Sequence, residues 1–162
     1  MSEVLFLDND NFPAAVRPTE LLGQQGEALA AEYLAGCGYR IVLTNFKVPV
    51  GRNSQGAQVT GEIDIVALDH ETLCFVEVKT RRSADFTPVI TAVDLRKQRQ
   101  ITRTAKIYRR IFGVFEMPYR FDVVTILMPE NAEPEIELSQ GYWDESKFRK
   151  RSWHSEMWHD HF

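Results

Sequence analysis

Two short stretches, Gly61-Glu-Ile-Asp-Ile-Val-Ala67 and Phe75-Val-Glu-Val-Lys79, decide the fold of this 162-residue chain. Both are rich in β-branched and aromatic residues, which predicts two strands. Only residues 68–72 separate them, so the two strands are predicted to form an antiparallel hairpin. Each strand places carboxylates in an otherwise apolar run, where a charge is costly unless it is paired or bound to a metal. The hairpin is therefore where a functional site is expected.

The alternation of side chains along a strand predicts which charged groups meet. Glu62 and Asp64 are expected to share one side, as are Glu77 and Lys79. Carboxylate oxygens suit a hard divalent cation, Mg²⁺ or Mn²⁺, and the backbone carbonyl of Val78 is placed to join Asp64 and Glu77 as a ligand. Such an ion polarises a phosphodiester, and the lysine can orient the attacking water or stabilise developing negative charge. Glu62 is either an outer ligand or the partner of a nearby arginine.

A purely structural alternative is a buried ion pair that closes one side of the hairpin. In it, Lys79 pairs with Asp64 or with Glu77. Three acids facing one base leave this arrangement short of positive charge. A bound cation corrects the imbalance, so the pattern favours a metal site.

Composition places the chain among ordinary folded proteins, with 44% hydrophobic and 26% charged residues. No apolar run is long enough to span a bilayer, and the first residues lack a basic region followed by an apolar stretch, so we expect a cytoplasmic protein without a membrane partner. Cys37 and Cys74 are predicted to be buried, reduced thiols. Three histidines near the last residue are interpreted as part of a docked or disordered tail: His154, His159 and His161.

The charge is unevenly distributed along the chain. The net charge is −4, yet residues 79–110 hold ten cationic and two acidic side chains. Residues 129–162 hold eight acidic and four cationic side chains. A basic segment inside an acidic protein favours binding of a polyanion such as nucleic acid. The alternative is a solvated helix face without a partner.

The remaining pattern predicts an α-β-β-β-α-β order, a mixed α/β sandwich. Gly23 and Gly26 lower the helix propensity of the first helix, so we expect them to permit close approach of another element. The domain organisation is predicted as an N-terminal arm (1–18), one folded domain (19–128) and a C-terminal extension (129–162). The predicted elements are a helix from near Thr19 to Gly38, a strand over Tyr39–Val48, a flexible turn over Pro49–Val59, the two acidic strands, a polar connection from Arg81 to Thr91, a helix over Ala92–Phe112 and a last core strand over Arg120–Met128.

Several of these motifs together resemble the bacterial YraN-like family. They are the two acidic strands, Gly26-Glu27 in the first helix, the pattern Ala92–Arg99 and the closing Arg120–Val124, and the match covers roughly residues 22–127. The resemblance implies a place in the PD-(D/E)xK nuclease superfamily, so the domain at 19–128 is expected to be nuclease-like. It also implies a restriction-endonuclease-like α-β-β-β-α-β core, with a central mixed sheet flanked by helices. This layout is similar to that of archaeal Holliday-junction resolvases.

The resemblance also assigns roles to residues. The superfamily acids correspond to Asp64 and Glu77, the lysine to Lys79, and the first-helix acid of resolvase-like members to Glu27. Lys97 and Gln98 match a helix position that supports the site or meets the phosphate. The implied catalytic set is Asp64, Glu77, Lys79, Glu27 and Gln98, and the implied metal ligands are Asp64, Glu77, Glu27 and the carbonyl of Val78.

The expected activity is that of a Mg²⁺- or Mn²⁺-dependent endonuclease acting on structured or damaged DNA. The alternatives are a non-catalytic nucleic-acid-binding or assembly module with the same fold, and an RNA-directed nuclease. A homodimer is expected by analogy. Ile63 stands in place of the proline that is usual in the superfamily, a change that YraN-like sequences share, and the loop over Pro49–Thr60 is longer than the turn that is usual in the family. The expected phosphate contacts are Arg81, Arg82, Lys97, Arg99 and Arg103.

Overall fold

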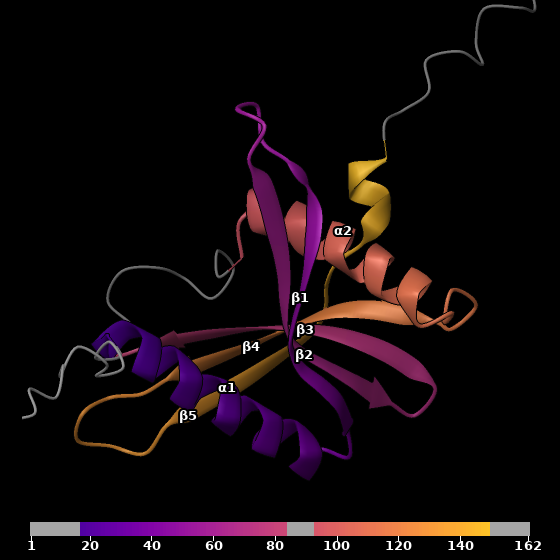
Figure 1. The fold of residues 1–162 in the computed structure, drawn as a ribbon. Coiled ribbons are helices and arrows are strands. Elements are labelled where there is room, and N and C mark those ends of the chain that lie inside the picture. Colours follow the sequence, from indigo (N-terminus) through magenta and orange to yellow (C-terminus); the bar gives the residue numbers. More distant parts are fainter. Residues whose placement is uncertain (1–16, 84–92, 150–162) are drawn as a thin grey trace, which may run out of the picture.

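A computed structural model describes residues 17–83 and 93–149 of the chain (Figure 1). These residues form two α-helices, five strands and one short 3-10 helix. In chain order the elements are α1 (Pro18–Gly36), β1 (Arg40–Arg52), β2 (Gln58–Asp69), β3 (Thr72–Arg81), α2 (Leu95–Ile111), β4 (Tyr119–Leu127), β5 (Glu135–Trp143) and η2 (Glu145–Phe148).

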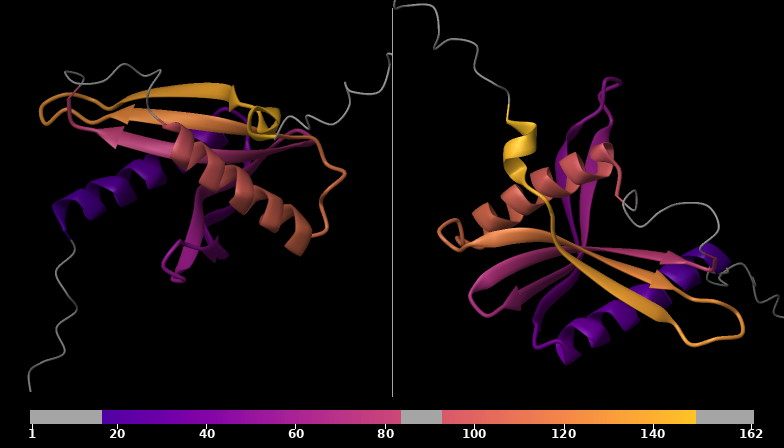
Figure 2. Two further views of the ribbon diagram at one scale, coloured as in Figure 1. Left: turned by 90° about the horizontal axis from the view of Figure 1, so that it is seen from above. Right: turned by 180° about the vertical axis from the view of Figure 1, so that it is seen from behind.

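The five strands form one mixed sheet in the order β1-β2-β3-β4-β5. β3 and β4 run parallel, and the other neighbouring pairs are antiparallel. A parallel pair needs a crossover connection, and here the connection contains α2. The two helices pack on opposite faces of the sheet (Figure 2). The structure thus confirms the predicted α/β class, a mixed central sheet flanked by helices in a layout consistent with a restriction-endonuclease-like core.

Each face of the sheet carries its own apolar core. Phe75 and Ile101 are fully buried on the face that α2 covers. Leu34 and Ile65 are fully buried on the face that α1 covers. Because β3 is covered on both faces, its side chains form an almost continuous buried run, in which a carboxylate such as Glu77 is exceptional.

The first helix begins and ends at residues with clear local reasons. The helix begins at Pro18, one residue before the predicted Thr19, because Arg17 is the N-cap and Pro18 occupies the first helical position. Proline suits that position, since its missing N–H would have no partner inside the helix. The predicted stop is confirmed: α1 ends at Gly36, and Gly38 takes a φ of +91°, which a glycine adopts without strain.

Of the two glycines predicted to permit a close approach, only one does so. A Cβ atom on Gly26 would lie 1.8 Å from Oγ1 and 2.9 Å from Cβ of Thr80, so α1 touches β3 at this position. A Cβ atom on Gly23 would meet nothing within 4 Å. The expectation of close packing is therefore confirmed for Gly26 and wrong for Gly23.

The flexible turn predicted over Pro49–Val59 is wrong. β1 continues through Arg52 and pairs with β2, so the connection shrinks to residues 53–57. Oδ1 of Asn53 accepts hydrogen bonds from the N–H groups of Gln55 and Ala57, at 3.0 and 2.9 Å. An asparagine side chain that bonds its own following backbone forms a tight turn, which leaves the flanking residues free to pair as strands.

The second helix is shorter than the predicted Ala92–Phe112. α2 begins at Leu95, because the side chain of Asp94 accepts a hydrogen bond of 2.8 Å from the N–H of Lys97 and so caps the helix. The first residue of the predicted helix lies outside the described residues, as does most of the predicted connection over Arg81–Thr91.

A fifth strand, which the sequence did not predict, lies in the segment taken as a C-terminal extension. β5 pairs with β4 in antiparallel fashion at the edge of the sheet. Trp143 at its end is only 7% exposed and stacks on Phe121, with 4.7 Å between the ring centroids. Residues 135–143 therefore contribute to the same sheet and core as the predicted domain.

The remaining expectations have mixed outcomes. Cys74 is buried as predicted, but Cys37 is exposed, because it caps α1 at a surface turn. The tail histidines and residues 1–16 of the arm predicted over 1–18 lie outside the described residues, whereas Arg17 and Pro18 belong to the start of α1. Within the part of the chain that the structure describes, neither helix is long and apolar enough to cross a membrane.

The packing of α1 on β3 generates a first prediction. Gly26→Ala should lower the free energy of unfolding by about 2 kcal/mol or more, because the new methyl group overlaps the branched Cβ of Thr80 rather than a flexible chain end. Gly23→Ala, the matched control, should leave stability unchanged or raise it by up to about 1 kcal/mol, since it adds helix propensity in open space. Urea unfolding of the two variants measures the difference. Equal stability of the two variants would contradict the close contact.

Candidate active site

The ladder between β2 and β3 ends where two predicted site residues lie. β2 pairs with β3 from Asp69 to Ile65, and Ile65 stands opposite Val76. Beyond Ile65, β2 pairs with β1 alone. The N–H of Val78, which thereby has no partner strand on this side, donates a 2.8 Å hydrogen bond to Oδ2 of Asp64. A carboxylate thus closes the gap that the separating strands leave in the ladder.

The alternation of β2 side chains between the two faces of the sheet is also interrupted at this point. Ile63 and Ile65 are two residues apart, yet they pack in the cores on opposite faces of the sheet. In β1, Asn45 lies between the partners of these two isoleucines and has a φ of +53°, a conformation that asparagine adopts more readily than most residues. The alternation that predicts Glu62 and Asp64 on one side therefore does not run unbroken through this point.

Glu77 is the most deeply buried acid of the predicted site, at 2% exposed. Its Oε1 lies 2.9 Å from Nζ of Lys79 and 3.5 Å from Nζ of Lys97, which comes from the first turn of α2. Glu77 and Lys79 therefore share a side, as predicted. The second oxygen, Oε2, is buried without a hydrogen-bond partner among the residues that the structure describes. Such an oxygen is costly to bury, which marks it as a position where a further donor or a cation is accommodated.

The first helix adds Glu27 to the same region. Burial raises the pKa of Glu27, a hydrogen bond from the side chain of Asn45 opposes the rise, and the charges of Glu62 and Glu77 add to it. Glu62 forms an ion pair of 3.4 Å with Lys47, its neighbour across the β1–β2 ladder, rather than with an arginine. Asn45 and Lys47 are contributions to the site that the sequence did not reveal.

Asp64 is 8% exposed, and its ionisation is strongly opposed. Burial raises its pKa to about 7, and the nearby charges of Glu77 and Glu27 act in the same direction. The hydrogen bond from Val78 and the charge of Lys97 lower it. The three predicted acids Asp64, Glu77 and Glu27 are therefore close enough to repel one another in a poorly solvated place.

The predicted helper residue Gln98 serves to join two segments. Its side chain is buried. Its Nε2 donates a 2.8 Å hydrogen bond to the carbonyl of Val93, which lies just before α2. Its Oε1 accepts a 3.3 Å hydrogen bond from Nζ of Lys147 in η2. The amide thus connects the start of α2, which carries Lys97, to the C-terminal segment.

The predicted phosphate-binding cations are placed in different ways. Lys97 points to Glu77, whereas Arg82 forms an ion pair with Glu130 and Arg99 lies over the ring of Phe148. Arg103 is exposed on the outer side of α2, and Arg81 is half-buried at the end of β3. Exposed cations recur along α2 at helical spacing, at Arg96, Arg99, Arg103, Lys106 and Arg110.

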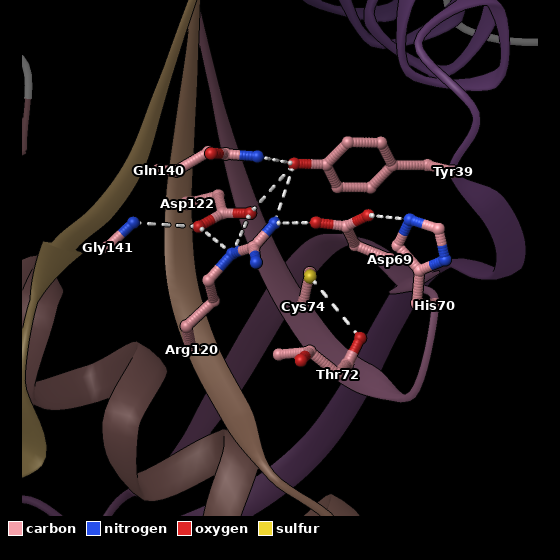
Figure 3. Close-up of polar contacts among 9 residues, drawn as sticks. All are labelled: Tyr39, Asp69, His70, Thr72, Cys74, Arg120, Asp122, Gln140 and Gly141. Carbon is pink, nitrogen blue, oxygen red and sulfur yellow. Dashed lines mark hydrogen bonds and ion pairs between the residues drawn. The ribbon is translucent and has the colours of Figure 1, made fainter.

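A second charged cluster lies on the α1 side of the sheet, away from the strand separation (Figure 3). Asp122 in β4 is completely buried and accepts hydrogen bonds from Arg120 at 3.0 Å and from the N–H of Gly141 at 2.9 Å. Arg120 also donates to Asp69 at 2.7 Å and to the hydroxyl of Tyr39 at 2.8 Å. The polar groups of this cluster bond to one another, so the cluster joins β2, β4, β5 and Tyr39, the residue just before β1.

The acids at the strand separation have the chemistry of a cation site, although they are not gathered into a finished one. Among the described residues, no three His, Cys, Asp or Glu side chains come together closely enough to hold a metal ion. Two observations nevertheless fit a hard cation. Oε2 of Glu77 has no hydrogen-bond partner among the described residues, and the pKa of Asp64 is raised. A positive ion would relieve both, since it satisfies the oxygen and offsets the repulsion.

Comparison with known proteins places this chain in a family. The model of the uncharacterised protein family UPF0102 matches residues 26–126, which span α1 to β4 and include each predicted catalytic residue. The chain belongs to UPF0102. This family is the YraN-like one that the sequence motifs resemble.

Individual UPF0102 proteins match over most of their length. The protein from Chlorobium limicola is 44% identical over 65% of this chain and 74% of its own, and the protein from Geotalea uraniireducens is 44% identical over 72% and 84%. The protein from Renibacterium salmoninarum is 39% identical over 74% and 93%. Among solved structures, that of SSO0001 matches 81% of this chain and 56% of its own, with 15% identity and a TM-score of 0.37.

The buried state of Asp64 predicts how the stability of this UPF0102 protein depends on pH. Its folded-state pKa lies above the ordinary 3.8, so the folded state binds more protons than the unfolded state between about pH 4 and 7. The stability that protonated Asp64 contributes is present at pH 4 and is lost as the pH rises through about 7. Asp64→Asn, which stays neutral, should therefore stabilise the metal-free protein at pH 8 by roughly 1–3 kcal/mol and have little effect at pH 4.

Thermal unfolding in EDTA at both pH values measures this difference. Glu116→Gln, which removes an exposed acid between α2 and β4, is the matched control and should change stability little at either pH. An Asp64→Asn variant that is less stable than the natural protein at pH 8 would contradict the costly buried charge.

Proposed function

We propose that this protein is a metal-dependent endonuclease that hydrolyses phosphodiester bonds in DNA. The observation that carries the proposal is the strand separation at Asp64. It places a buried carboxyl with a raised pKa close to Glu77. Within residues 17–83 and 93–149, one oxygen of Glu77 has no hydrogen-bond partner, and the other forms ion pairs with Lys79 and Lys97. Acids that need a cation, beside lysines that can meet an anion, are the parts that phosphodiester hydrolysis requires.

The proposed metal site uses residues that already lie in this region. Asp64 and Glu77 would hold Mg²⁺ or Mn²⁺, and Glu27 and the carbonyl of Val78 are the proposed further ligands. The observed contact of Val78 with Asp64 is made by its N–H, which fixes the carboxylate. When bound, the ion supplies polarisation of the phosphoryl oxygens and lowers the pKa of a bound water.

The side chains around the acids divide the remaining work. Lys79 is proposed to orient the attacking water or to stabilise negative charge as it develops, because its ammonium group is fixed by Glu77 at 2.9 Å. Lys97 is proposed to contact the phosphate from the first turn of α2. Gln98 holds that turn through its bonds to Val93 and Lys147, so it is a positioning residue for Lys97.

Binding of the substrate is proposed to use the cations outside the acidic centre. Arg81, Arg82, Arg99 and Arg103 would contact phosphates, so affinity should fall steeply with salt. We propose structured or damaged DNA as the substrate, as in repair or recombination, because the small domain leaves little room for elements that read a base sequence. A homodimer remains part of the proposal by analogy.

One observation favours a second candidate, a nucleic-acid-binding module without turnover. Both lysines already neutralise one oxygen of Glu77, and the described residues do not form a finished three-ligand metal site. In that case the lysines balance a buried acid and no metal enters. An RNA-directed nuclease would use the same residues as the proposed DNA enzyme, so it is distinguished by substrate alone.

A cleavage assay tests the proposal directly. We expect Mg²⁺- or Mn²⁺-dependent products from labelled duplex, flapped or four-way-junction DNA, and none in EDTA. Asp64→Asn and Lys79→Ala should each lower the rate by at least about 100-fold, because each removes a group proposed to act on the reacting phosphate. Glu137→Gln, at an exposed acid on β5, is the control and should keep full activity.

Each outcome of the assay selects one reading. Metal-dependent products that persist in Asp64→Asn would show that a contaminant cleaves the DNA. Cleavage of RNA but not DNA would replace the proposed substrate. Binding of DNA with no product from any nucleic acid would favour the non-catalytic module.

Metal binding is expected to show in stability as well as in activity. At pH 8, millimolar Mn²⁺ or Mg²⁺ should raise the unfolding midpoint of the natural protein, because the ion binds only the folded state. The rise should be largely lost in Glu77→Gln, which removes the charge but keeps the shape, and kept in Glu137→Gln. Differential scanning calorimetry measures it, and an equal rise in all three proteins would mean that the ion binds elsewhere.

A further inference from the structure

The β1–β2 hairpin extends beyond the sheet as a two-stranded arm (Figure 1). From Phe46 opposite Ile63 to Arg52 opposite Gln58, the two strands pair with each other, while β2 pairs with β3 only from Ile65 onward. Seven residues of β1 and six of β2 span roughly 20 Å at the usual rise of a strand. We refer to residues 46–63 as the β-arm.

The β-arm contacts α2 and is braced within its own turn. Near its base, Nε2 of Gln100 in α2 donates a 2.9 Å hydrogen bond to the carbonyl of Thr60. Gly61 lets α2 approach, because a Cβ atom there would lie 2.0 Å from Oγ1 of Thr104. At the tip, the guanidinium of Arg52 donates a 2.8 Å hydrogen bond to the carbonyl of Gly56. An isolated hairpin is only marginally stable, so these contacts preorganise the arm.

The chemistry of the β-arm suits an anionic, polar partner. The β-arm contains two cations, Lys47 and Arg52, and one acid, Glu62, which pairs with Lys47 near the sheet and leaves Arg52 as the cation of the outer part. Its exposed side chains are mostly amides and hydroxyls, which can bond to phosphates, sugars and base edges. The exposed polar residues of its outer part are Arg52, Asn53, Ser54, Gln55, Gln58 and Thr60.

The position of the β-arm links it to the candidate active site. Its base carries Glu62, paired with Lys47, and Asp64 follows directly where β2 rejoins the sheet. A nucleic acid whose scissile phosphate lies at Asp64 and Glu77 therefore has neighbouring nucleotides within reach of the arm. The major groove of a duplex, about 12 Å wide, admits a two-stranded β-ribbon, whereas a single strand offers no groove.

We propose that the β-arm binds a double-stranded segment of nucleic acid beside the scissile phosphate by entering its groove. The inference rests on the proposed function and deepens it, because it names the duplex as the form that the site selects. Arg52 at the tip contacts a backbone phosphate or a base edge. The amides and hydroxyls of the tip add further polar contacts in the groove.

Binding measurements with short DNA test this role separately from cleavage. Fluorescence anisotropy with a labelled duplex and its labelled single strand, both in EDTA, gives the affinity without turnover. Arg52→Glu should weaken duplex binding about 10-fold and reduce the slope of log affinity against log salt by about one, since it removes one phosphate contact. Single-strand affinity should change less than threefold. Arg52→Lys, which keeps the charge, should retain most of the duplex affinity.

The matched control is Arg40→Glu, the same charge change at an exposed residue where β1 begins, at the far end of the strand. It should leave duplex affinity nearly unchanged. Equal weakening by Arg40→Glu and Arg52→Glu, equal loss on single strands, or no duplex binding by the natural protein would each overturn the proposal. If Arg52→Glu binds duplex DNA as the natural protein does and still cleaves it, the role of the β-arm alone is overturned. If duplex binding depends on Arg52 but no cleavage occurs, the proposed nuclease activity is overturned and the role of the β-arm stands.

Discussion

The hydrogen bond from the N–H of Val78 to Asp64 is the constraint on which the rest of the site depends. Two strands can separate inside a covered sheet only if the backbone groups at the separation find other partners. Asp64 supplies one, so β2 is able to leave β3 at Ile65 without leaving that N–H group unsatisfied. The same event has two consequences: it places a carboxylate beside Glu77, and it sends the β-arm away from the sheet. The candidate site and the arm thus have one structural origin.

The two buried charge clusters of the molecule differ in how completely they are satisfied. Around Asp122, an arginine and a backbone N–H group donate to the carboxylate, and the cluster joins β2, β4, β5 and Tyr39 just before β1. Around Glu77, one oxygen pairs with two lysines while the other has no partner among the described residues, and the neighbouring Asp64 resists ionisation. Both oxygens of Asp122 are satisfied, whereas a buried polar atom of Glu77 is left unsatisfied at a cost to the fold. This contrast is why the Glu77 region, and not the Asp122 region, is the candidate for function.

The C-terminal segment is more closely integrated with the site than its place in the sequence indicates. β5 ends at Trp143, whose Nε1 donates a 2.9 Å hydrogen bond to Oγ1 of Thr102 in α2. In the following η2, Nζ of Lys147 donates a hydrogen bond to Gln98. Gln98 is the residue that follows Lys97 in α2. The family match ends at residue 126, so this brace lies outside the stretch that defines UPF0102. It fixes the helix that delivers a lysine to Glu77.

Local patterns in the sequence were sufficient for the elements and for the candidate residues. The acidic hairpin, the glycine stop at Gly38 and the apolar stripe of α2 each follow from residue preferences over a few positions, so the α/β class and the pairing of β2 with β3 were predictable. What only the tertiary structure decided depends on contacts between distant residues. The separation of β2 at Asp64, the two lysines on Glu77 and the strand β5 arise because packing and unpaired backbone groups select them. The alternation of side chains along one strand does not depend on where the neighbouring strand stops pairing with it. The sequence could therefore identify the acids, whereas their arrangement depended on the tertiary structure.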